Sequence, residues 1–147
     1  MATPGIFLTL GGNVAPLMLY DSITGPIAVG TSNTLLWTNT IPSFNVGAPP
    51  VFHWNPGVVF QNTATSAITV NFTVSLDGGA FSTMATRILG ASGAAYSIAP
   101  FHYSFFVTSL DTSKVHTYQW GASASATGVN MVGGSGGFYF ALYGGVL

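Results

Sequence analysis

Apolar and polar residues alternate along much of the chain with the two-residue period of β-strands. The clearest case is residues 68–76, where every even position is apolar and the odd positions between them are Thr, Asn or Ser. The Asp77-Gly78-Gly79 sequence that follows is typical of a tight reversal, because glycine adopts positive φ without steric cost. We therefore predict a hairpin whose return strand covers residues 81–88. Because no window of a dozen residues keeps a helical period of about 3.6, we expect an all-β chain.

Shorter strand candidates lie on both sides of this hairpin. After it come residues 96–98, 102–110, 115–124, 129–132 and 138–143, and Pro100 separates the first two. Before it, seven of the eight prolines break the chain into extended pieces at residues 7–10, 17–20, 27–29, 35–38 and 58–60. Proline restricts strands to sheet edges, so we expect edge strands and long loops in residues 16–60. The prediction is an antiparallel jelly-roll sandwich over residues 16–147, preceded by an extended N-terminal arm of residues 1–15.

Two candidate strands are apolar on both faces. Residues 101–107 and 138–143 place aromatic or aliphatic groups at odd and even positions alike. An isolated sandwich leaves one face of each sheet in water, so we expect another subunit to cover the second face. In residues 115–124 the aromatic groups share one face, which is typical either of a core or of a subunit contact. The predicted interface residues are Tyr103, Phe105, Tyr118, Trp120, Phe138, Phe140 and Tyr143.

The chain contains few charged residues. Charged residues make up 3% of the 147 positions, the net charge is −1, and hydrophobic residues make up 48%. A hydrophobic fraction this high argues against a disordered chain. The two cationic side chains are too few to neutralise the phosphates of a nucleic acid, so we expect no nucleic-acid partner. The most apolar windows are shorter than the roughly 20 residues of a membrane-spanning helix, so we expect no membrane partner. There is no cysteine, which excludes disulfides and thiol chemistry.

Few residues are available for catalysis or metal binding. Asp77 lies in the predicted turn and Asp111 in a loop, where aspartate commonly stabilises the backbone, so we expect no carboxylate pair. His53, His102 and His116 are the plausible metal ligands, and no two have the close spacing of a metal motif. A site shared by His102 and His116, on neighbouring strands or around a threefold axis, is an alternative to ordinary hydrogen-bonded histidines. We expect no cofactor and no enzymatic activity.

Four segments together resemble a known fold family. They are Pro16-Leu17-Met18-Leu19-Tyr20, residues 68–76, His116-Thr117-Tyr118-Gln119-Trp120, and the aromatic last strand with its tail, residues 138–147. In order and character they resemble the jelly roll of tumour necrosis factor and complement-head proteins, a fold that recurs in trimeric virion proteins of bacteriophages and other viruses. The resemblance implies a homotrimer with inner-sheet aromatics at the threefold axis. Low charge and the proline-rich first half fit the virion branch better than the cytokine branch.

The leading functional hypothesis is a structural virion protein on the capsid surface. It would be a homotrimeric capsid decoration (cement) protein or a minor capsid protein, bound without covalent bonds to the major capsid protein or other virion proteins. In this hypothesis the arm docks on the capsid through Ile6, Phe7, Leu8 and Leu10. The alternative is the receptor-binding or glycan-binding head of a viral spike or tail fibre, which would use loop aromatics such as Trp37, Trp54 or Trp120.

Overall fold

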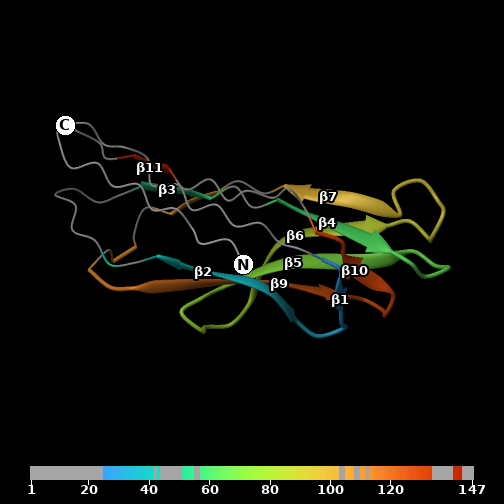
Figure 1. Cartoon of the computed structure of the whole chain (residues 1–147), viewed down its shortest axis with the longest axis horizontal. Helices are drawn as coiled ribbons and strands as arrows, with labels where there is room; N and C mark the ends of the chain where they lie inside the picture. Colours follow the sequence, from blue (N-terminus) through green and yellow to red (C-terminus); the bar gives the residue numbers. More distant parts are fainter. Residues whose placement is uncertain are drawn as a thin grey trace.

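A computed structural model describes residues 25–41, 43, 51–54, 57–102, 105–107, 110–111, 113–133 and 141–143. In this part of the chain the fold is an all-β sandwich with two layers of antiparallel strands (Figure 1). Strands β3, β8 and β11, and residue 102, are described by their backbone only. Within the described ranges, no helix is long and apolar enough to cross a membrane.

The first layer is a four-stranded sheet, and the second combines a four-stranded and a three-stranded sheet. The first sheet has the order β2 (Thr34–Ile41), β9 (His116–Ala124), β5 (Ile68–Leu76), β6 (Ser82–Leu89). The four-stranded sheet of the second layer has the order β1 (Ile27–Val29), β10 (Val129–Met131), β4 (Gly57–Asn62), β7 (Ile98–His102). The three-stranded sheet has the order β11 (Ala141–Tyr143), β3 (Val51–Trp54), β8 (Phe105–Val107). Because β3 leads into β4, and β7 into β8, the small sheet continues the second layer.

The all-β prediction is confirmed, and most strands lie where the alternation places them. β5 and β1 have the predicted bounds, and β6, β9 and β10 differ by one residue at one or both ends. β2 and β4 are longer than predicted, and β11 occupies the last three residues of its candidate. β3 was not predicted.

The strand boundary predicted at Pro100 is wrong. Pro100 lies inside β7, opposite Val59 of β4, and the predicted strand 102–110 is divided between the end of β7 and β8. β7 is the last strand in its sheet order. An edge strand tolerates proline because the N–H groups on its outer side need no ladder partner.

The core is built around stacked aromatic rings between the layers. The rings of Trp37, Phe72 and Trp120 lie with centroids 5.6 to 5.8 Å apart. Phe101 of the second layer lies 6.5 Å from Phe72 of the first layer, and this contact joins the two layers. Phe101 also packs edge-on against Phe60 of its own layer, at 4.9 Å. A bulge opposite Trp120 adds Leu36 to β2, so that Leu36 and Trp37 are both buried.

Candidate functional site

The side chains of β9 named as interface candidates lie in the core of the chain itself. Tyr118 is 4% exposed and Trp120 is 0% exposed, because their face of β9 is turned toward the second layer. Of the two alternatives for this strand, the structure therefore shows the core, and the assignment of these two residues to a subunit contact is wrong. Trp37 is also buried, so neither it nor Trp120 presents a ring for stacking on a sugar. The side chain of Trp54 lies outside the described residues.

The remaining interface and arm predictions are untested by the described part of the chain. Phe105 and Tyr143 belong to strands β8 and β11, whose side chains are outside it. The others also lie outside it: Tyr103, Phe138 and Phe140 of the predicted interface, and Ile6, Phe7, Leu8 and Leu10 of the predicted arm.

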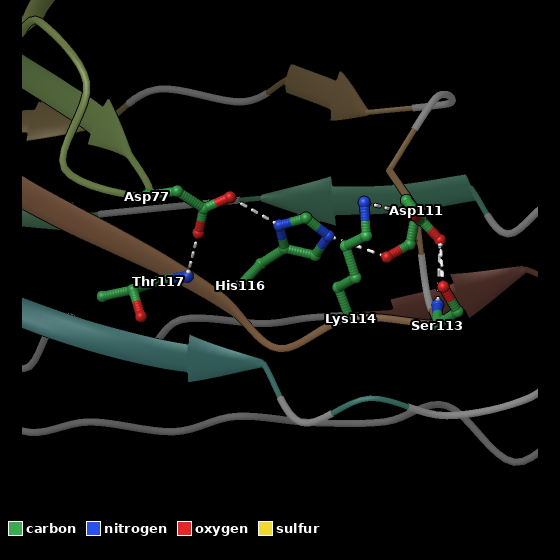
Figure 2. Close-up of polar contacts among 6 residues, drawn as sticks. All are labelled: Asp77, Asp111, Ser113, Lys114, His116 and Thr117. Atoms are coloured by element: carbon green, nitrogen blue, oxygen red, sulfur yellow. Dashed lines mark hydrogen bonds and ion pairs between the residues drawn. The ribbon is translucent and has the colours of Figure 1, made fainter.

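A polar cluster occupies one end of the first sheet, where the β5–β6 turn meets the start of β9 (Figure 2). The turn has positive φ at Asp77 (52°) and Gly78 (73°), and the Gly79 N–H donates to the Leu76 carbonyl at 2.9 Å. Two successive positive φ values are characteristic of a type I′ turn, in which aspartate and glycine are favoured at these positions. The backbone role predicted for Asp77 is therefore confirmed.

The carboxylate of Asp77 also reaches β9. Its Oδ1 accepts a hydrogen bond from the Thr117 N–H at 2.7 Å, and its Oδ2 lies 2.7 Å from Nδ1 of His116. The Asp77 N–H donates to the Thr117 carbonyl at 2.8 Å. The hydrogen bond from the Thr117 amide, followed by that from His116, lowers the pKa of Asp77. Three contacts thus fasten the turn to the first two residues of β9.

His116 is held between two acceptors. Nδ1 faces the Asp77 carboxylate, and Nε2 lies 2.8 Å from the main-chain carbonyl of Asp111. A neutral imidazole carries one N–H, whereas the imidazolium carries two, so only the protonated ring donates to both partners. The hydrogen bond to Asp77 is the main cause of a raised pKa for His116, and it outweighs the opposing effect of burial. The arrangement favours a positively charged ring.

The loop before β9 has its own polar network. Asp111 Oδ1 accepts from the Ser113 N–H at 3.1 Å and from the Ser113 hydroxyl at 2.6 Å, as in an Asx turn. Its Oδ2 lies 3.2 Å from Nζ of Lys114, and both side chains are largely exposed. These contacts, with the Ser113 hydroxyl first, lower the pKa of Asp111. Apart from Arg87, every charged residue in the described ranges belongs to this cluster.

Sequence reasoning assigned backbone roles to Asp77 and Asp111 and missed their joint contact with His116. This contact follows from the strand register that pairs Leu76 with Tyr118, and no local sequence pattern reveals that register. Both ring nitrogens of His116 are engaged, so the ring offers none to a metal shared with His102. Among the described residues, no three His, Asp or Glu side chains are grouped as in a metal site.

A second surface feature involves β6, β7 and the connection between them. Three large apolar side chains are exposed there: Ile88 of β6 (71%), Tyr96 of the connection (81%) and Ile98 of β7 (53%). We call them the exposed apolar residues. Tyr96 has a φ of 65°, which is rare for a bulky side chain, and its carbonyl accepts from the Gly90 N–H at 3.1 Å. Non-glycine residues held at positive φ cluster at functional sites, so Tyr96 and the exposed apolar residues on the adjoining strands are candidates for contact with another molecule.

The buried side chain of Asn62 supports this connection. Its Nδ2 donates to the carbonyls of Ser66 at 2.8 Å and Gly90 at 2.9 Å, and its Oδ1 accepts from the Ala64 N–H at 2.8 Å. The Asn62 N–H donates to the Ser97 carbonyl at 2.7 Å. Two of these four hydrogen bonds, those to Gly90 and Ser97, thus hold the two ends of the segment that carries Tyr96.

Comparison with known proteins identifies the fold. No family model and no curated protein matches the chain. Among solved structures, the infectious bursal disease virus VP2 subviral particle matches with a TM-score of 0.57 and 11% identity, over 97% of this chain and 38% of that one. The Gx strain of the same virus matches with a TM-score of 0.55 and 13% identity, over 100% of this chain and 39% of that one. The chain therefore spans less than two fifths of the length of the viral chains with which it shares an all-β fold.

Proposed function

We propose that this protein is a structural virion protein, a homotrimeric capsid decoration (cement) protein or a minor capsid protein that stabilises the shell by non-covalent contacts. The observation that carries the proposal is the likeness, over nearly the whole chain, to chains of virus particles. In this role the protein acts on the capsid surface, with the major capsid protein or other virion proteins as partners. The function is structural, and no step of it is chemical.

Strand pairing supports a jelly roll as the architecture of the trimer subunit. With the small sheet β11-β3-β8 set aside, eight strands remain in the two four-stranded sheets. The first pairs with the eighth (β1–β10), the second with the seventh (β2–β9), the third with the sixth (β4–β7) and the fourth with the fifth (β5–β6). Such nesting arises when one long antiparallel hairpin is wrapped into a two-layer sandwich, which is the eight-stranded plan of jelly rolls in viral capsids.

The exposed apolar residues of β6, β7 and their connection support assembly with other chains. Ile88, Tyr96 and Ile98 expose apolar surface where β6 and β7, the last strands of their sheets, come near each other. Natural proteins commonly protect exposed edges with charged side chains, but Arg87 is the one charged residue on these two strands. Burial against another chain would remove this surface from water and depend little on salt.

The predicted interface and arm complete the proposal. Tyr103, Phe105, Phe138, Phe140 and Tyr143 belong to the two segments that are apolar on both faces, and we assign them to the contact between subunits. Residues 1–15 act as the arm, with Ile6, Phe7, Leu8 and Leu10 as the side chains that dock on the capsid.

Particle composition tests the proposed role. Virus particles are purified from the source of this sequence by density gradient, and the chain is quantified by mass spectrometry against the major capsid protein. We expect the chain to co-sediment with particles in a fixed ratio that survives molar salt. Recombinant chain added to particles that lack it should bind and raise their disruption temperature, and a chain without residues 1–15 should bind less. A full-length chain that stays in the soluble fraction and leaves particle stability unchanged would refute the proposal.

A further inference from the structure

The contacts of His116 connect two loops that are distant in sequence. One ring nitrogen faces the carboxylate of Asp77 in the β5–β6 turn, and the other faces the carbonyl of Asp111 in the loop before β9 (Figure 2). The residue itself begins β9 and is only 8% exposed. Any change in the number of ring protons therefore acts on both loops from a fixed point in the sheet.

We propose that His116 is a proton-operated clamp: the doubly protonated ring holds the β5–β6 turn and the loop before β9 together, and loss of one ring proton releases this end of the sandwich. When the ring is neutral, one nitrogen presents a lone pair to an acceptor oxygen. The hydrogen bond at that nitrogen is then replaced by repulsion between two acceptors. This inference concerns the regulation of the fold and does not depend on the proposed virion role.

The charged groups around the ring favour its doubly protonated form, in which the clamp is closed and the two loops are held together. The turn contributes the Asp77 carboxylate, and the loop contributes Asp111 and Lys114, whose ammonium is 3.2 Å from the Asp111 carboxylate. On the neighbouring strand β2, the residue paired with His116 is the uncharged Ile41. Among the described residues the remaining cation, Arg87, lies instead over the ring of Phe101. Two carboxylates and one already paired ammonium therefore surround the imidazolium.

The direction of the pKa shifts gives the pH range of the clamp. The pKa of His116 is raised above its ordinary 6.5, so its contribution is complete below that value and is lost as the pH rises through the folded-state pKa. The pKa of Asp77 is lowered below its ordinary 3.8, so its contribution is present above that value and is lost as the pH falls through the folded-state pKa. The clamp is closed in mild acid and opens toward alkaline pH.

Opening would change the surface at this end of the sandwich. Leu76 precedes Asp77 and is 39% exposed, and Val115 precedes His116 and is 57% exposed. Leu76 and Val115 are thus the chain neighbours of two residues that the clamp holds. Loss of the ring proton would therefore change the position of these two apolar side chains relative to each other.

Nuclear magnetic resonance of the full 147-residue chain tests the clamp directly. The ring of His116 is titrated, and hydrogen-exchange protection of the Thr117 amide, which donates to Asp77, is measured from pH 5 to pH 9 and corrected for intrinsic exchange. The titration gives the pKa of His116 in the folded chain. For each pH unit by which this pKa exceeds that of an ordinary histidine, we expect the protection of the Thr117 amide to fall by about tenfold between acid and alkaline pH. The amide shifts of Asp77 and Lys114 should follow the same midpoint, whereas that of Ala124, at the other end of β9, should not.

Two matched variants separate the clamp from a general effect of charge. Asp77→Asn keeps an acceptor oxygen for the Thr117 amide and suits positive φ, but it removes the carboxylate, so the His116 midpoint should fall and the protection should lose most of its pH dependence. Asp111→Asn keeps the main-chain carbonyl that accepts from Nε2, so the dependence should remain. The proposal is overturned if Thr117 protection in the natural chain is flat across the titration, or if Asp77→Asn retains the full dependence.

Discussion

Trp37 and Trp120 face each other across β2 and β9 and donate to one shared acceptor. Their rings stack with centroids 5.6 Å apart and planes 18° apart. The indole N–H of Trp37 reaches Asn39 Oδ1 at 3.1 Å, and that of Trp120 reaches the same oxygen at 2.9 Å. Buried indoles require such an acceptor, so this one amide oxygen allows two large rings to lie in the core.

Replacing the shared acceptor should destabilise the sandwich. We expect Asn39→Leu to lower the free energy of unfolding by about 1–3 kcal/mol, because two buried N–H groups lose the oxygen to which they donate. Urea denaturation measures the change. Asn71→Leu is the matched control, since the Asn71 side chain bonds the Thr86 hydroxyl in an exposed position, and it should cost about 0.5 kcal/mol or less. Equal losses in the two variants would contradict the role of Asn39.

The unfolding temperature should depend on pH in a direction set by His116. Because its pKa is raised in the folded chain, we expect the thermal midpoint of the natural chain to fall as the pH increases from 6 through the folded-state pKa. His116→Gln, which cannot gain the second ring proton, should lose this alkaline decline and approach the natural chain at high pH. Differential scanning calorimetry at pH 6 and pH 9 measures both effects. If the thermal midpoint of the variant declined at alkaline pH as much as that of the natural chain, a titratable group other than His116 would be the cause.

Gly121 should tolerate no large side chain. A Cβ at this position would lie 3.0 Å from Phe81 Cε1, 3.0 Å from Thr73 Oγ1 and 3.1 Å from the Thr34 carbonyl oxygen. We expect Gly121→Val to lower the free energy of unfolding by about 1–3 kcal/mol, because the added side chain would meet two side chains and the backbone of a neighbouring strand. At Gly30 the nearest atom to an added Cβ is Thr34 Oγ1, at an ordinary 3.5 Å, so Gly30→Val should cost less. Denaturant unfolding of the pair gives the comparison, and the reverse order would be a contradiction.

A change of one atom at Asn62 should disturb the connection that carries Tyr96. In Asn62→Asp, a carboxylate oxygen replaces the amide nitrogen that now donates to the carbonyls of Ser66 and Gly90. We expect a loss of more than about 2 kcal/mol at pH 7, and a smaller loss at pH 4, where a protonated carboxyl donates again. Asn71→Asp, whose side-chain oxygen already accepts from Thr86, is the control. A loss at Asn62 that does not depend on pH would contradict this explanation.

Strands with complete local signals could be predicted from the sequence, whereas contacts that depend on register could not. β5 has the predicted bounds because its alternation runs unbroken into Asp77-Gly78-Gly79. β3 was missed because Val51-Phe52-His53-Trp54 lacks alternation and follows Pro49-Pro50. The contact between Asp77 and His116 requires the pairing of β5 with β9, which tertiary packing decides. For the same reason, the sequence could not show whether Trp120 faces the core or another subunit.

The molar mass of the purified protein in solution tests the central claim, assembly into a virion trimer, most directly. Light scattering at low salt and in molar salt should give the mass of three chains of 15.2 kDa each in both conditions, because the proposed contacts bury apolar surface and contain few charges. A 15.2 kDa monomer in both conditions would contradict the account, since the exposed apolar residues and the doubly apolar segments would then have no second copy to cover them.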